Sequence, residues 1–108
     1  MTPEQINEAV ARKLGWTNSD YPVKGWLKRF YKGPEGEKEY YLDEPEDYCR
    51  SIEAAWEIIG SLKCDWEMKT TSYGIDFTIF DDAGEFPSAV EDTVPMAICM
   101  AYLRMETK

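Results

Sequence analysis

The sequence contains no histidine, and it is poor in the other residues on which small catalytic sites depend. Without histidine, the chain lacks the usual general base of Ser-His-Asp and Cys-His sites and the commonest ligand of transition metals. Its three cysteines, Cys49, Cys64 and Cys99, lie far apart and form no C-x-x-C pair, which argues against a structural zinc. We therefore expect no catalytic residue, no bound metal and no enzymatic activity.

Glycine-rich phosphate-binding loops are also missing. Neither G-x-x-x-x-G-K-[ST] nor G-x-G-x-x-G occurs, so the chain has no recognisable nucleotide cradle. The acidic run Asp81–Glu85 has a superficial likeness to a calcium loop, but a calcium-binding hand spreads its ligands over about twelve residues. We expect a turn in this run and no cofactor in the protein.

Long apolar runs are absent as well. The longest are only a few residues, and the N-terminal segment Met1–Val10 is polar rather than a hydrophobic signal. No segment is therefore expected to enter a membrane. An odd number of cysteines without a secretory signal is typical of a reducing compartment, so we expect reduced thiols in a cytoplasmic protein.

Acidic residues are abundant. The 21 Asp and Glu outnumber the 12 Lys and Arg and give a net charge of −9. Such a surface repels phosphate and anionic lipid, so direct nucleic-acid binding is not expected. The charge is compatible with a basic protein partner, but solubility alone is the simpler and preferred explanation. The oligomeric state is not determined by the sequence, and a homodimer is one option.

The chain of 108 residues is long enough for one domain, residues 1–108, with one core. Helical spacing predicts a helix near each end and one in the middle. Alternation predicts strands over 64–70 and 75–80, followed by a short strand with Pro87 at an edge or bulge. This order predicts an α+β fold, with about three to five antiparallel strands and three helices packed as a layered α/β/α sandwich.

The helices have recognisable ends and apolar stripes. Thr2 and Gln5 form a capping box with Pro3 between them, and Gly15 suits the position after the helix. Asp92 or Thr93 caps the last helix. The middle helix is expected to bury one stripe, which also includes a tryptophan: Ile52, Ala55, Trp56, Ile59 and Leu62.

The segment 17–47 is the least regular part of the chain. The runs WLKRFYK and EKEYYL alternate loosely and predict a hairpin across Gly33–Gly36, with a loop as the alternative. Basic residues gather in the first run, and acidic residues gather from Pro34 to Asp47. In a hairpin, these opposite charges would stand side by side and stabilise each other.

Two stretches, Tyr48–Trp56 and Glu91–Leu103, resemble the signature segments of the phage ABA sandwich domain family. The first usually reads like Tyr-Ser-Thr-Asp-Ile-Ala-Ala-Ala-Trp in that family, and the second like Ala-Asp-Thr-Ala-Pro-Leu-Ala-Ile-Cys. The matching residues are Tyr48, Ile52, Ala54, Ala55 and Trp56, and Asp92, Thr93, Pro95, Ala97, Ile98 and Cys99.

The chain departs from the family pattern at residues 49–51, where Cys-Arg-Ser replaces Ser-Thr-Asp. This change predicts that the helix cap moves to Asp47. The resemblance implies a layered α/β/α sandwich and an accessory role for a phage or prophage in the host cytoplasm, with no catalytic residue to carry over. Because acids flank Cys49 and raise the pKa of a thiol, we interpret it as inert.

Two hypotheses for function follow from these observations. In the first, the protein binds a protein partner through an acidic and aromatic surface, for example to occupy the nucleic-acid channel of a host-defence nuclease. That surface comprises Glu35, Glu37, Glu39, Tyr40, Tyr41, Asp43, Glu44, Glu46 and Asp47. In the second, a basic and aromatic stretch binds and sequesters a small molecule such as a nucleotide. That stretch comprises Lys24, Trp26, Lys28, Arg29, Phe30 and Tyr31.

Overall fold

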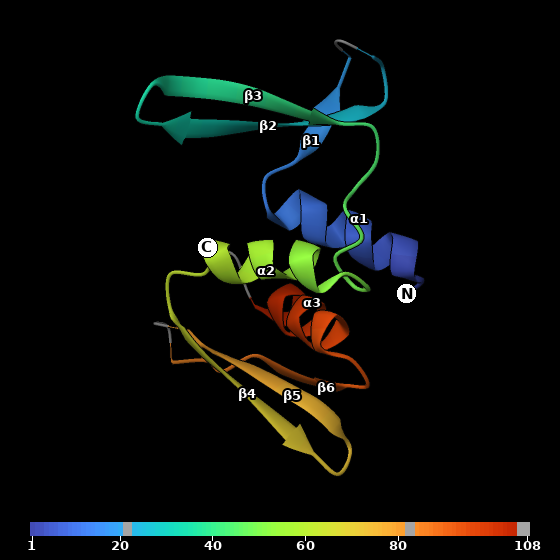
Figure 1. Cartoon of the computed structure of the whole chain (residues 1–108), viewed down its shortest axis with the longest axis vertical. Coiled ribbons are helices and arrows are strands. Elements are labelled where there is room, and N and C mark those ends of the chain that lie inside the picture. The colour runs from blue at the N-terminus through green and yellow to red at the C-terminus, as the bar shows by residue number, and fades with distance from the viewer. Residues whose placement is uncertain (21–22, 82–83, 106–108) are drawn as a thin grey trace.

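Within the described part of the chain, residues 1–20, 23–81 and 84–105, two three-stranded antiparallel sheets lie on opposite sides of three helices in the computed structural model (Figure 1). The side chains of residues 31–33 are not described. The helices are α1 (Pro3–Lys13), α2 (Ile52–Ser61) and α3 (Val94–Arg104). The strands are β1 (Thr17–Ser19), β2 (Trp26–Gly33), β3 (Gly36–Leu42), β4 (Asp65–Thr71), β5 (Gly74–Phe80) and β6 (Ser88–Glu91).

The α+β class is confirmed, but the strands form two sheets, β1–β2–β3 and β4–β5–β6, where one was expected. The reason lies in α3, which contacts β5 and β6 as well as α1 and α2. Its buried residues cover much of its circumference: Ala97, Ile98, Cys99, Ala101 and Tyr102. A helix that is apolar on several sides must be covered on several sides. The helices therefore fill the space between the two sheets and separate them.

Helix α1 begins as the sequence predicts. The Thr2 side chain accepts a hydrogen bond from the Gln5 amide, and the Gln5 side chain accepts one from the Thr2 amide at 2.8 Å. These two bonds satisfy donors that the first turn of a helix leaves without partners. Ile6 and Val10 are buried, and Trp16, just after the helix, folds back into the core.

The cap of α2 differs from the prediction. Ser51 is the capping residue, and its side chain accepts from the Ala54 amide. Residues 48–50 form a separate turn, in which the Asp47 carbonyl accepts from the amides of Arg50 and Ser51. Asp47 is therefore too far from the first helical residue to cap it. Serine caps helices as well as aspartate does, so Ser51 needs no help from Asp47.

The buried face of α2 is also rotated relative to the expected stripe. Ala55 and Ile58 are fully buried, whereas Ile52 and Trp56 are 48% and 51% exposed. Ala55, Ile58, Ile59 and Leu62 are spaced at i, i+3, i+4 and i+7, which is one face of a helix. Ile58 lies at the centre of this buried face, and Trp56 lies at its edge. The Trp56 ring packs edge to face against the Trp66 ring, with 6.1 Å between the ring centroids, and is therefore only partly buried.

The sheet β4–β5–β6 carries the densest part of the core. Phe77 and Ile79 of β5 point to the helices and are fully buried. Met68 of β4 has the same orientation but remains exposed, because β4 is an edge strand while α3 covers β5 and β6. Strand β6 begins directly after Pro87, whose carbonyl accepts from the Ile79 amide at 2.9 Å. Because β6 is an edge strand, proline is tolerated at its start, although it has no amide hydrogen to donate to a neighbouring strand.

The hairpin β2–β3 is confirmed, and its register places Gly33 opposite Gly36. Figure 1 shows its turn extending beyond the helices, and residues 34–40 are all exposed. The expected pairing of opposite charges across the hairpin occurs in the register only where Lys32 stands opposite Glu37. Lys28 stands opposite Tyr41, and Phe30 stands opposite Glu39. The register set by the tight turn thus places charges beside aromatic rings.

Candidate functional site

The two faces of the β2–β3 hairpin have different roles. Leu27 and Leu42 are paired across the strands and pack on the core. Side chains alternate along a strand, so the next pair on that face, Arg29 and Tyr40, also points to the helices. The other face points away from them. It carries Lys28 and Phe30 from β2, and Glu37, Glu39 and Tyr41 from β3.

The outward face combines carboxylates with aromatic rings. Phe30 is 56% exposed, and Glu37 and Glu39 are exposed beside it. The Tyr41 hydroxyl donates a hydrogen bond to the Glu39 carboxylate, which holds the two side chains together. Glu35 adds a further acid at the turn, 3.7 Å from Lys38 Nζ. We call this surface the acidic hairpin face; its acids and rings are Phe30, Glu35, Glu37, Glu39 and Tyr41, and Lys28 lies beside them.

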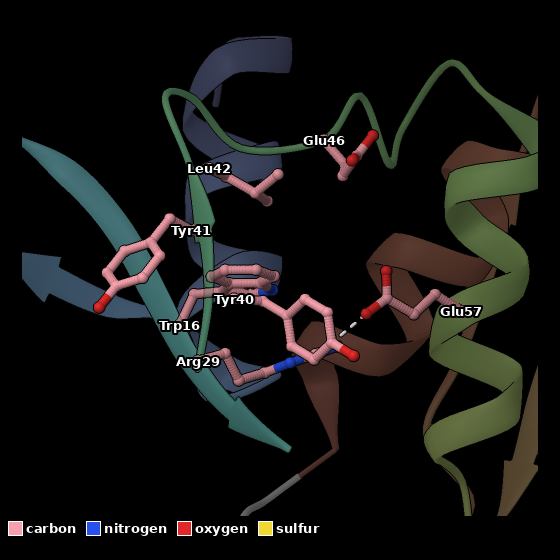
Figure 2. Close-up of a pocket in the computed structure, with 7 residues that line it drawn as sticks. All are labelled: Trp16, Arg29, Tyr40, Tyr41, Leu42, Glu46 and Glu57. Atoms are coloured by element: carbon pink, nitrogen blue, oxygen red, sulfur yellow. Dashed lines mark ion pairs between the residues drawn. The ribbon is translucent and has the colours of Figure 1, made fainter. Parts of the chain in front are cut away.

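Behind the hairpin, a cavity of about 370 Å³ separates β2 and β3 from α2 (Figure 2). Its lining comprises Trp16, Arg29, Tyr40, Tyr41, Leu42, Glu46 and Glu57. The Arg29 guanidinium lies 4.9 Å from the Trp16 ring centroid, and its Nη1 lies 2.8 Å from Glu57 Oε1. Both side chains of this ion pair are half-buried, and the pair connects the hairpin sheet to α2 directly.

Trp16 and Tyr48 lie among these charges and are almost completely buried. Trp16 Nε1 and Tyr48 Oη have no hydrogen-bond partner among the described residues. Burial raises the pKa of Tyr48 far above its usual range, and the nearby Glu57 carboxylate raises it further. The phenol is therefore neutral at all physiological pH values.

The last acids of the predicted partner surface have local structural roles. The Asp43 carboxylate accepts from the Glu44 amide at 3.0 Å, which stabilises the turn after β3. The Asp47 carboxylate accepts from Asn7 Nδ2 at 2.9 Å and from Arg50 Nε at 3.0 Å. The hydrogen bond from Asn7 and the charge of Arg50 hold the pKa of Asp47 below its ordinary value. Asp47 thus joins α1 to the turn that precedes α2.

Replacing Asp47 with asparagine is expected to lower the free energy of unfolding at neutral pH by about 1 kcal/mol, because the site is partly exposed. Since folding lowers the pKa of this carboxyl, its contribution is present above about pH 4 and is lost as the pH falls further. Urea unfolding at pH 7 and at pH 3 measures both effects. Asp65→Asn, at an exposed position on β4, is the control. An equal loss at both pH values would contradict the assignment.

The basic and aromatic stretch does not form one surface, because strand alternation divides it. Arg29 points into the cavity, whereas Lys28 and Phe30 lie on the opposite face, with Lys28 Nζ 5.9 Å from the Phe30 ring centroid. The other three members lie as follows: Lys24 is exposed before β2, Trp26 is half-buried at its start, and the side chain of Tyr31 lies outside the described residues. A single small ligand cannot contact all six.

Two residues of the cavity were missed by sequence reasoning. These residues are Trp16, which follows α1, and Glu57, which lies on α2. The structure places both side chains against Arg29 of β2. An arginine on the core-facing side of a strand indicates that a carboxylate lies nearby. The sequence does not say which element supplies that carboxylate.

The structure shows no further constellation for chemistry within residues 1–20, 23–81 and 84–105. Over these ranges, no three His, Cys, Asp or Glu side chains are placed to hold a metal ion, and no helix is long and apolar enough to cross a bilayer. Burial raises the pKa of the Cys49 thiol and raises that of Cys99 to about 12, so neither thiol ionises readily.

This fold matches a known protein family and a solved structure. The family model of the phage ABA sandwich domain matches residues 8–103, which is nearly the whole chain. The chain belongs to the phage ABA sandwich domain family. A solved structure similar to it is the 2.0 Å crystal structure of a phage protein from Bacillus cereus ATCC 14579. The two share 26% sequence identity with a TM-score of 0.71, over 96% of this chain and 91% of the other.

No curated protein matches this family member significantly. The match at residues 8–103 includes the hairpin and the cavity as well as both signature segments. The similarity to the Bacillus cereus phage protein likewise extends over nearly the full length of both chains. The hairpin sheet is therefore within the region shared with the family, and it is no separate addition to the domain.

Proposed function

We propose that this member of the phage ABA sandwich domain family acts in the host cytoplasm by binding a basic protein partner through the acidic hairpin face. The single observation that carries the proposal is the position of this surface. The acids of β3 and the turn lie on a hairpin that extends beyond the helices, where they do not contribute to the core (Figure 1).

The chemistry of the surface supports a protein partner. Glu37 and Glu39 lie on one strand face about 7 Å apart, and the exposed ring of Phe30 stands opposite Glu39. Aromatic rings supply contact area in protein interfaces, and carboxylates steer a basic partner and set its register. The net charge of −9 acts in the same direction. A basic nucleic-acid channel of a host-defence nuclease is a surface of this kind.

The small-molecule hypothesis has weaker support. Its residues are divided between two faces, and among the described residues the cavity lining sets two carboxylates, Glu46 and Glu57, against one cation, Arg29. A nucleotide phosphate would be repelled by this net negative lining. Glu57 already pairs with the Arg29 guanidinium, so this cation is not free to bind a phosphate.

The test compares two charge reversals that are matched in geometry. Glu37→Lys with Glu39→Lys reverses two acids on the outward face of β3. The control, Asp65→Lys with Glu67→Lys, reverses two acids at the same spacing on exposed β4. The wild type is expected to capture a saturable, salt-sensitive partner from a lysate of the host bacterium. The hairpin variant should bind that partner at least about tenfold more weakly, and the control should bind normally.

Two outcomes would reject the proposal. One is that the wild-type protein retains no saturable protein partner. The other is that the hairpin variant and the β4 control lose equal affinity, because a change in total charge would then explain the effect. Circular dichroism of both variants establishes that the folds are intact before binding is compared.

A further inference from the structure

The cavity behind the hairpin already holds one guanidinium group. The Arg29 side chain stacks on Trp16 and pairs with Glu57, so an aromatic ring and a carboxylate together bind it. This combination suits arginine in particular, because the planar guanidinium stacks on rings and forks toward carboxylate oxygens. Arg29 therefore demonstrates which chemistry this part of the protein accommodates.

A second ring and a second carboxylate line the same cavity nearer to solvent. Tyr40 is 48% exposed, and Glu46 is exposed on the segment that leads to α2. Figure 2 shows the Tyr40 ring in front of Trp16 and beside the Arg29–Glu57 pair, while Tyr41 points to the other side of β3. Among the described side chains, no basic group lies within ion-pair distance of Glu46. One cation and two carboxylates leave the lining with a net charge of −1.

We infer that this cavity receives an arginine side chain of the partner, with its guanidinium stacked on Tyr40 and paired with Glu46. The inference rests on the proposed function, whose partner is basic. The volume of about 370 Å³ falls within the range of about 300–1,000 Å³ for ligand pockets. Arginine is also enriched among the residues that dominate interface energies when they insert into pockets.

The position of the cavity agrees with the acidic hairpin face. Neighbouring residues on β3 point to opposite sides, so Glu39 faces outward and Tyr40 faces the cavity. A partner that contacts both sides of β3 would place basic residues on the outward acids and one arginine behind the strand. The outward acids attract the partner over distance, and the cavity fixes its orientation.

The experiment uses N-acetyl-arginine amide as the probe and the isosteric, uncharged N-acetyl-citrulline amide as its control. Nuclear magnetic resonance titration of the full chain follows the signals of Tyr40 and the Trp16 indole. The arginine probe is expected to shift both signals in a saturable manner, and the citrulline compound is expected to leave them unchanged. Glu46→Gln should weaken binding of the probe at least about fivefold, since it removes one charge and keeps the shape.

Glu53→Gln, at an exposed position of α2, is the matched control and should bind like the wild type. Equal shifts with both compounds, or unchanged binding to Glu46→Gln, would overturn the inference. The result also separates this inference from the proposed function. If the probe does not bind but capture still depends on Glu37 and Glu39, only the arginine pocket is rejected. If the probe binds in the cavity but capture ignores the hairpin acids, the proposed function is rejected.

Discussion

Replacing Tyr48 with alanine is expected to lower the free energy of unfolding by about 3–5 kcal/mol, as for other large aromatic residues removed from a core. Tyr48 is fully buried in the turn that precedes α2, where the hairpin sheet, the cavity and the helices meet. The deletion leaves a void between these elements, and the surrounding backbone can close it only in part. Urea unfolding followed by tryptophan fluorescence measures the loss, and a loss below about 1 kcal/mol would contradict this role.

Tyr48→Phe isolates the contribution of the hydroxyl. Since Tyr48 Oη has no described hydrogen-bond partner, its removal is expected to change stability by less than about 1 kcal/mol and in the direction of stabilisation. The two proteins should differ at alkaline pH. Folding raises the pKa of Tyr48, so only the unfolded state ionises above about pH 10, and wild-type stability falls there. Tyr48→Phe should not show the part of this loss of stability that comes from ionisation of Tyr48.

The second large effect is expected at Gly74, where β5 begins. Its φ angle is +134°, and a Cβ atom at this position would lie 2.5 Å from the Glu91 carbonyl oxygen of β6. Gly74→Ala therefore has to move one backbone strand away from another, in addition to adopting a strained conformation. We expect a loss of about 2–4 kcal/mol in the free energy of unfolding, measured by urea titration.

Gly36→Ala provides the control for Gly74→Ala. Gly36 has a φ angle of +110° at the β2–β3 turn, and a Cβ atom added there would meet no neighbouring atom within 4 Å. This variant carries only the conformational cost of a left-handed residue, about 1–2 kcal/mol. Similar losses in the two alanine variants would show that the contact with Glu91 has no energetic importance.

The features that the sequence predicted well are local. Thr2 and Gln5 are three residues apart, and the chemistry of their reciprocal hydrogen bonds is complete within one turn. The hairpin was also predictable, because glycines flank its turn and the runs on both sides alternate. The strands β4 and β5 were also predictable, since alternation is typical of a sheet with one covered face.

The features that were predicted wrongly depend on contacts between distant elements. The orientation of α2 could not be read from its own apolar residues, because Ile52, Trp56 and Ile58 are all apolar and only packing against α3 selects the buried ones. The division into two sheets depends on α3 being covered on several sides. The cavity joins Trp16, Arg29 and Glu57 from three separate parts of the chain, and no spacing in the sequence encodes that meeting.

The hairpin that extends beyond the helices also changes how much surface this small chain has to offer. Its principal axes are 47, 30 and 22 Å, and its accessible surface is 7154 Å². A monomer of the same mass with average compactness would expose about 6,200 Å². The surplus is comparable to the area of about 800 Å² that each side contributes to a standard protein–protein interface. The elongated shape thus provides a chain of 108 residues with enough surface for a standard-sized interface.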